Sequence, residues 1–191
     1  MSATRVRMSK EERREQILDA ATQAFAEHGF AGTTTDQVAQ AAGVSQPYVV
    51  RIFGSKRCLF RAVFERIGDR IVDAFEAVPA GPDARDRLGD AYVELLADRN
   101  LLRVLMHGFV AASDPDLGAS ARAVLVRAFE IYQERTGEGP EEARSFVATG
   151  MLINVLLATE APEHTDEPGV GALLTCAVGA DIAAALVRGA A

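Results

Sequence analysis

The chain has 191 residues, of which 49% are apolar and 6% aromatic, and its formal net charge at pH 7 is −7. This apolar content supports one or two compact units and excludes wholesale disorder. Residues 1–60 hold eight Lys and Arg against six Asp and Glu, whereas residues 61–191 hold twelve against twenty-one. A basic head on an acidic body can bind a polyanion through the head, so the overall acidity does not exclude nucleic acid. The alternative is an ordinary acidic protein whose charge asymmetry has no function.

The two cysteines, Cys58 and Cys176, lie far apart, and the sequence has no CxxC pair or Cys/His cluster. We therefore expect structural thiols in a reducing cytoplasm, and neither a metal nor another cofactor. The start, MSATRVRMSKEERRE, lacks an apolar core and is not expected to be a signal peptide. The apolar tail from Val170 to Val187 has the length of a membrane span. Because Asp181 and several small residues interrupt it, we expect no membrane association.

The first predicted elements are a basic arm and a long helix. Residues 1–8 form the arm, with Arg5 and Arg7. Ser9 and Glu12 then form a capping-box pattern, in which each residue satisfies a backbone N–H of the other. A helix with apolar residues at helical spacing follows and is expected to run to about His28.

Two short helices around a tight turn are predicted next. Thr34 and Gln37 form a second capping box, and Gly43 suits the left-handed residue that ends this helix. Ser45 is expected to cap the following helix, and Pro47 falls in its first turn, where a missing N–H costs little.

The second of these short helices has two different faces. Val49 and Phe53 lie on one side and are expected to be buried. The other side carries polar, small and cationic residues: Gln46, Pro47, Val50 and Arg51. A short helix with this division is typical of a DNA-reading helix.

The block from about Lys10 to Val63 resembles the DNA-binding domain of the tetracycline-repressor (TetR) family of bacterial regulators. The matching elements, in order, are Phe25-Ala26-Glu27-His28-Gly29-Phe30, the Thr-Thr pair, the Ala-Gly-Val-Ser turn and Phe53-x-x-Lys56-x-x-Leu59-Phe60. The resemblance implies a helix-turn-helix DNA-binding domain over residues 1–55 and a ligand-binding and dimerisation bundle over residues 56–191. Abundant Ala and the lack of an alternating strand pattern also favour an all-α fold of about nine helices.

The remaining helices are predicted from hydrophobic spacing and from Pro and Gly breaks. The first of them is shared by the head and the body and therefore connects the two. The expected ranges are about 55–78, 83–98, 101–112, 115–136, 140–159 and 170–188. The segment EAPEHTDEPG, between the last two, is polar and expected to be mobile.

The resemblance implies roles for residues of the helix-turn-helix. Thr34 and Thr35 would face a phosphate from a helix N-terminus, and Lys56 would contact another. Base reading would come from the third helix, because amide, apolar and guanidinium groups suit adenine, the thymine methyl and guanine. Gln46 would read adenine, and Pro47 would contact the thymine methyl. Arg51 would read guanine or, alternatively, hold a phosphate.

Two positions depart from the commonest family pattern. Many members have Gly where Pro47 stands and Tyr where Val50 stands, and the missing tyrosine removes an expected phosphate contact. Tyr48 either replaces that contact or packs on the first helix. The predicted DNA surface therefore comprises Thr34, Thr35, Ser45, Gln46, Pro47, Tyr48, Val50, Arg51 and Lys56.

In the body, the last two predicted helices are the most apolar, and the resemblance implies that they form a homodimer interface. Monomeric core packing is the alternative. A small-molecule pocket is expected among the helices between about 83 and 159, because an apolar cavity with a few polar groups is the usual ligand site. The predicted lining is Tyr92, Leu96, Met106, His107, Phe109, Val110, Phe129, Tyr132, Phe146, Met151 and Asn154, and plain core packing is the alternative for each of them.

The sequence thus predicts a cytoplasmic homodimeric regulator, expected to be a repressor that binds a palindromic operator in double-stranded DNA. A mostly apolar small molecule would release it. No phosphate loop, metal-spaced set or catalytic triad pattern is present, so we do not expect an enzyme. The alternative is a helical ligand carrier or interaction protein with a non-functional helix-turn-helix.

Overall fold

The computed structural model describes residues 8–190, with side chains to residue 188; the predicted arm residues Arg5 and Arg7 lie outside the described residues. The described chain is helical and contains no strand, which confirms the all-α prediction. The helices are α1 (Lys10–Gly32), α2 (Thr35–Ala41), α3 (Gln46–Phe53), α4 (Lys56–Glu76), α5 (Ala84–Leu96), α6 (Arg99–Val110), α7 (Pro115–Thr136), α8 (Pro140–Ala158), the 3-10 helix η1 (Ala161–Glu163), α9 (Val170–Val178) and α10 (Ala180–Ala190).

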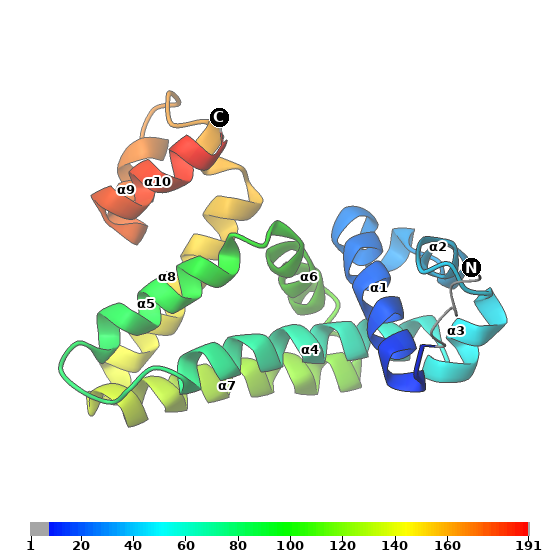
Figure 1. The fold of residues 1–191 in the computed structure, drawn as a ribbon. Coiled ribbons are helices and arrows are strands. Elements are labelled where there is room, and N and C mark those ends of the chain that lie inside the picture. Colours follow the sequence, from blue (N-terminus) through cyan, green and yellow to red (C-terminus); the bar gives the residue numbers. More distant parts are fainter. Residues whose placement is uncertain (1–7, 191) are drawn as a thin grey trace, which may run out of the picture.

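Figure 1 shows two regions joined by one long helix. The head consists of α1, α2 and α3 and lies at one end of the molecule. From it, α4 runs beside α7 along the base of the body, and α5 and α8 lie at the far end. Helix α6 stands between the head and α8, and α9 and α10 form a separate lobe above α5. We use "head" and "body" for these two regions below.

Side-chain caps fix where the head helices begin. The Ser9 hydroxyl accepts a hydrogen bond from the Glu12 amide, and the Glu12 carboxylate accepts one from the Ser9 amide at 2.7 Å. The backbone N–H of Ser9 thereby lowers the pKa of Glu12. At α2, the Gln37 side chain accepts from the Thr34 amide at 2.7 Å while the Thr34 hydroxyl accepts from the Gln37 amide. Both predicted capping boxes are confirmed.

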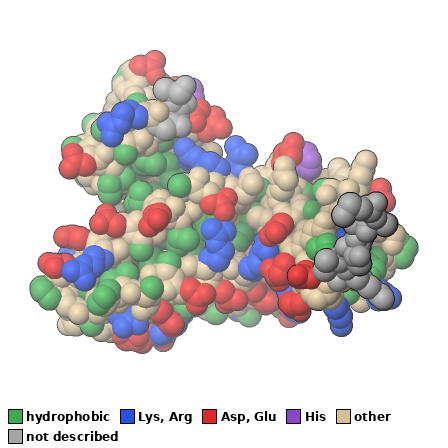
Figure 2. All heavy atoms as spheres, viewed as in Figure 1, with side chains coloured by type: hydrophobic (Ala, Val, Ile, Leu, Met, Phe, Trp, Pro, Cys, Tyr) green, Lys and Arg blue, Asp and Glu red, His purple; other side chains and the backbone are tan. Residues whose placement is uncertain are grey.

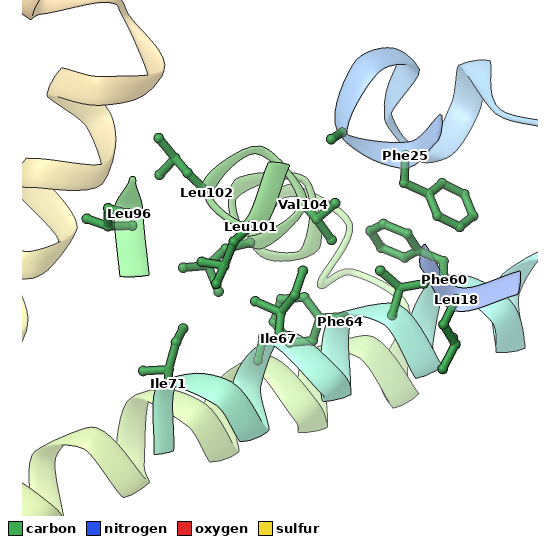
Figure 3. Packing of buried hydrophobic residues seen from close by; sticks show 14 of the residues in the cluster. Leu18, Phe25, Phe60, Phe64, Ile67, Ile71, Leu96, Leu101, Leu102 and Val104 are labelled. Carbon is green, nitrogen blue, oxygen red and sulfur yellow. The ribbon is translucent and has the colours of Figure 1, made fainter. Parts of the chain in front are cut away.

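Helix α4 supplies the core of both regions (Figure 3). Its first turns bring Phe60 into the head, where the ring lies 4.9 Å from that of Phe25 in an edge-to-face arrangement. Its next turns point Phe64 and Ile67 towards α6 in the body. Close packing with α6 depends on Gly108, because a Cβ there would lie 2.1 Å from the Phe64 ring.

Polar contacts also tie α4 to its neighbours. The Arg66 guanidinium donates to Asp19 at 2.8 Å and to the Thr22 hydroxyl at 2.8 Å, which links α4 to α1. At its first turn, Arg57 pairs with Asp114, the capping residue of α7, at 3.1 Å. A displacement of α4 or α7 in the body is therefore coupled to the position of the head.

The C-terminal region differs from the prediction of one helix over about 170–188. Gly179, at φ 81° and ψ 161°, divides it into α9 and α10, which are bent by 119°. Few residues other than glycine adopt that conformation, and no apolar pattern marks the bend. The segment before α9, predicted to be mobile, contains η1, whose Ala161 and Pro162 are buried. Within the described chain, no single helix is long and apolar enough to cross a membrane, and only the bent pair taken together meets the length and composition criteria.

Candidate DNA interface and ligand pocket

The recognition face of α3 is set by the turn that precedes it. Gly43 adopts φ 63° and ends α2, as predicted. Val49 is then buried in the head core, whereas Pro47, Val50 and Arg51 are exposed. Ser45 lies at the N-cap position, but its side chain makes no capping hydrogen bond, so the predicted cap is wrong. Its exposed hydroxyl is available to an external partner.

Gln46 is already engaged within the protein. Its side-chain amide donates to the Thr35 hydroxyl at 3.1 Å, and the side chain is half-buried. This bond links the start of α3 to the start of α2. Bidentate reading of adenine uses both the amide nitrogen and the amide oxygen of a glutamine. Such a contact therefore requires Gln46 to share or release its bond to Thr35.

Lys56 likewise has partners in the head. Its ammonium donates to the Phe30 carbonyl at 2.9 Å and to the Ala31 carbonyl at 3.5 Å, and it lies 4.7 Å from the centre of the Phe30 ring. A cation at the C-terminal end of α1 is stabilised by the unpaired carbonyls there. Because an ammonium has three N–H donors, a phosphate contact remains compatible with this clamp.

Tyr48 and Arg51 form a pair on the surface of α3. The Tyr48 ring is half-buried against the head core, and the Arg51 guanidinium lies 4.6 Å above its centre. Such a cation–π contact holds the guanidinium in place while leaving its N–H groups free. Tyr48 thus packs against the head core, and its contact to DNA stays a prediction.

A basic hollow borders this pair, and the sequence did not predict it. It lies between the start of α1 and the α2–α3 turn and brings Lys10 and Arg13 beside Arg51. The full lining within the described residues is Met8, Ser9, Lys10, Arg13, Gly43, Val44, Ser45, Tyr48 and Arg51, which includes no carboxylate. The first helix approaches the turn only after folding, so spacing along the chain gives no signal for this hollow.

The body contains an apolar cavity of about 50 Å³ among α4, α5, α6, α7 and α8. Five of the predicted pocket residues line it: Tyr92, Phe109, Phe146, Met151 and Asn154. The lining residues that were not predicted are Ile71, Phe75, Leu105, Val124, Leu125, Ala128, Val147 and Gly150. Ile71 and Phe75 were missed because α4 was not expected to contribute a wall. The others lie on α6, α7 and α8, which were expected to contribute, but helical spacing did not identify which of their residues face the cavity.

The other predicted pocket residues lie elsewhere. Leu96 is core, Met106 is half-buried, and Val110 is 82% exposed. His107 packs against the head, where a Cβ on Gly29 would lie 3.2 Å from its imidazole. Phe129 lines a shallow hollow on the outer side of α7 and α8. Tyr132 is buried beneath the stacked ring of Phe146, and its hydroxyl donates to Glu138.

The cavity holds one polar pair. The Tyr92 hydroxyl donates to the Asn154 side-chain oxygen at 2.8 Å, and Asn154 is 1% exposed. Burial raises the pKa of Tyr92 to about 12, against the smaller opposing effect of this hydrogen bond. The phenol is therefore neutral at physiological pH. In the described part of the chain, no group of three or more His, Cys, Asp or Glu side chains is placed to hold a metal ion.

The predicted dimer face is partly used within the chain. Leu156 of α8 and Leu174 of α9 are both buried in a small C-terminal hydrophobic cluster. Three large apolar side chains on these helices are more than a third exposed: Leu152, Val155 and Leu173. These helices therefore pack against each other within the monomer and also expose apolar side chains to solvent.

Comparison with known proteins agrees with this geometry. The family model "Bacterial regulatory proteins, tetR family" matches residues 17–63. The chain is 37% identical over 83 residues to the HTH-type transcriptional activator FasR of Mycolicibacterium smegmatis, covering 43% of this chain and 38% of that protein. It is 34% identical over 94 residues to the HTH-type transcriptional repressor SCO4008 of Streptomyces coelicolor, covering 47% and 46%.

A solved structure extends the likeness to the body. The crystal structure of a tetR-family transcriptional regulator from Streptomyces coelicolor superposes with a TM-score of 0.68 at 22% identity, covering 96% of this chain and 90% of that one. This likeness concerns the fold. The chain matches less than half the length of the two curated relatives. Residues 17–63 therefore match the tetR family of bacterial regulatory proteins, and the whole chain shares the fold of a solved tetR-family regulator.

Proposed function

We propose that the protein is a homodimeric transcriptional regulator that binds a palindromic DNA operator through its head and is released by a small molecule bound in its body. The exposed α3 face beside the basic hollow is the observation that carries the DNA-binding part. The proposed head comprises residues 1–55, and residues 56–191 form the ligand-binding and dimerisation body. A regulator of bacterial chromosomal DNA acts in the cytoplasm.

Phosphate contacts give affinity and register, whereas base contacts give sequence preference. Lys10, Arg13 and Arg51 line one hollow and suit a phosphate of the backbone beside α3. Thr34 and Thr35, at the start of α2, suit a second phosphate. Pro47 and Val50 are exposed on α3 and offer apolar contacts to base edges in the major groove.

The dimer is proposed to form through α8 and the α9–α10 lobe. Leu152, Val155 and Leu173 supply exposed apolar area on these helices. A two-fold dimer presents two identical heads, so the half-sites of the operator should be related by inverted symmetry and spaced by about 10 bp or a similar fixed separation.

Ligand control follows from the helices that the cavity shares with the head. Ile71 and Phe75 of α4, and Leu105 and Phe109 of α6, line the cavity, while other residues of the same helices contact α1. A ligand that binds better to a conformation with displaced heads lowers DNA affinity by at most the ratio of its affinities for the two conformations. The curated relatives include one activator and one repressor; we propose repression, since release of a repressor is the simplest use of such coupling.

The proposal is tested by selecting DNA from genomic fragments and a random library with the purified full chain. We expect an enriched inverted repeat. Arg51→Ala should weaken binding to it by about 1–3 kcal/mol, and should relax sequence preference at one position of each half-site if Arg51 contacts a base.

Arg87→Ala is the matched control, because it removes the same charge from an exposed site on α5 in the body. It should leave the selected sequence and the affinity unchanged. If no sequence is enriched at low or moderate salt, the head is not a DNA reader. The protein would then be better described as a helical ligand carrier or interaction protein.

A further inference from the structure

The inner cavity borders a second hollow in the body. Tyr92, Phe146 and Gly150 line both and form a shared rim. The outer hollow is a cleft of about 300 Å³ between α5, α8 and the α9–α10 bend. Figure 2 shows hydrophobic side chains on the side of the α9–α10 lobe that faces the long helices, where Val178 and Ile182 line the cleft.

The two volumes decide how a ligand can fit. The inner cavity of about 50 Å³ accepts only a few non-hydrogen atoms, since one water needs roughly 10–15 Å³ of such space. Sites for small molecules usually measure about 300–1,000 Å³. The inner cavity alone is therefore too small for a ligand of ordinary size, whereas the two hollows together are large enough.

The inner cavity contains a buried hydrogen-bond donor that lacks a strong acceptor. The Asn154 side-chain oxygen accepts from Tyr92 at 2.8 Å. Within the described residues, the Asn154 side-chain nitrogen donates only to the Met151 sulfur, at 3.8 Å. A thioether is a weak acceptor and the amide nitrogen has two N–H groups. At least one N–H therefore points into apolar surroundings. A buried donor without an acceptor is unfavourable, and an acceptor oxygen of a ligand would relieve this cost.

The charge of the lining limits what that oxygen can belong to. The polar groups of the inner cavity, Tyr92 and Asn154, are both neutral, and the other lining side chains are apolar. An ionised carboxylate or phosphate placed there would lose its hydration without gaining a cation. A carbonyl oxygen needs only one N–H donor. The outer cleft, in contrast, is lined by charged and polar side chains as well: Arg85, Asp86, Asp90 and Thr149.

We propose that the effector is a mostly apolar molecule whose inner end is neutral and carries a carbonyl-type oxygen that accepts a hydrogen bond from the Asn154 amide in the inner cavity, with the rest of the molecule passing Gly150 into the outer cleft. This inference rests on the proposed function, because it names the ligand class of the body that the proposal assigns to effector binding.

Three probes with equal numbers of non-hydrogen atoms and similar shapes test the donor and the charge: acetophenone, isopropylbenzene and benzoate. Acetophenone carries a carbonyl, isopropylbenzene lacks an acceptor and benzoate is an anion. Dissociation constants are measured with the full chain by ligand-observed NMR. We expect acetophenone to bind and benzoate to show no binding at the same concentrations.

The decisive quantity is the ratio of the acetophenone affinity to the isopropylbenzene affinity, because it cancels effects of the variant on general cavity packing. In Tyr92→Phe/Asn154→Leu this ratio should fall roughly three- to tenfold, the range expected for one hydrogen bond. The double variant removes donor and acceptor together, so it leaves no orphaned polar group. Tyr92→Phe alone keeps the Asn154 amide and should keep the ratio.

The route past the rim is tested with octanophenone, which is too long for the inner cavity. A Cβ at position 150 would lie 3.3 Å from the Tyr92 ring, so Gly150→Leu should fill the rim and reduce octanophenone affinity by about tenfold or more through lost apolar burial. Ala148→Leu, at an exposed position two residues earlier on α8, should leave it unchanged.

Benzoate binding as tight as that of acetophenone would overturn the proposal, as would an unchanged affinity ratio in the double variant. Binding of the selected DNA is measured on the same preparation without probe. If DNA binds but acetophenone does not, the ligand class is wrong and the DNA-binding part of the proposed function stands. If acetophenone binds with the expected ratio but no DNA does, the proposed function fails and the ligand class stands.

Discussion

The head and the body differ in how far apart along the chain their candidate site residues lie. The proposed DNA surface falls almost entirely between Thr34 and Lys56, on two short helices and the start of a third. The cavity draws its lining from five helices between Ile71 and Asn154. A site of the first kind is fixed mainly by caps and turns, whereas one of the second kind depends on how long helices pack. The two regions should therefore respond differently to substitution.

The largest difference is expected between two phenylalanines. Phe60 is completely buried in the head, with its ring 4.9 Å from that of Phe25 and 5.3 Å from that of Phe30. Phe60→Ala should lower the free energy of unfolding by about 3–5 kcal/mol. Phe109→Ala should cost clearly less, because Phe109 is half-buried and already borders a cavity. Chemical denaturation at one protein concentration measures both, and equal losses would contradict the contrast between a closed head core and an open body core.

Two glycines of the body should respond with opposite signs. Gly179 holds the bend between α9 and α10 at φ 81° and ψ 161°, so Gly179→Ala should destabilise the protein by about 1–3 kcal/mol through backbone strain. Gly89 lies inside α5, and no atom of a neighbouring element lies within 4 Å of the position that a Cβ would occupy, so Gly89→Ala should stabilise by roughly 0.5–1 kcal/mol. Thermal unfolding followed by circular dichroism distinguishes them. A Gly179→Ala protein that is more helical and no less stable would mean that the single straight helix expected from the sequence is accessible.

At the start of α4, where the head meets the body, Lys56 and Arg57 are neighbours with different partners. Lys56→Ala removes the ammonium that holds the end of α1 and should cost about 1–2 kcal/mol, as expected for a hydrogen bond to a charged group. Arg57→Ala removes a partly exposed ion pair to Asp114 and should cost less than about 1 kcal/mol. Added salt should reduce the stability loss caused by Arg57→Ala more than the loss caused by Lys56→Ala. If Lys56→Ala weakens DNA binding without any change in stability, Lys56 acts as a phosphate contact alone.

The same contrast explains what the sequence could predict. Helix starts at Ser9 and Thr34, and the turn at Gly43, depend on neighbours within a few residues, and the structure agrees with all three. The bend at Gly179 was missed because a glycine among small apolar residues also fits a continuous helix. Pocket residues such as Val110 were misplaced because helical spacing identifies an apolar face without identifying the helix that covers it.

The candidate site shows the same limit at the level of single side chains. The exposed face of α3 was predictable from spacing, but the partners of Gln46 and Lys56 were not, since Thr35 and Phe30 reach them only through tertiary packing. The basic hollow was missed for the same reason. Local chemistry thus indicates which residue types are available on a surface, and packing determines which of their hydrogen-bonding groups are already used.

The smallest and most specific contrast lies within the helix-turn-helix itself, where two hydroxyl residues occupy equivalent N-cap positions. The Thr34 hydroxyl accepts from the Gln37 amide, whereas the Ser45 side chain makes no capping bond. Thr34→Ala should therefore cost about 1 kcal/mol of stability, and Ser45→Ala should stay within the roughly ±0.5 kcal/mol expected of a surface substitution. Denaturant midpoints of the two variants give this comparison directly. Equal costs would show that Ser45 caps α3 in solution by accepting a backbone N–H, and its own O–H would still be free to donate to a DNA phosphate beside Arg51.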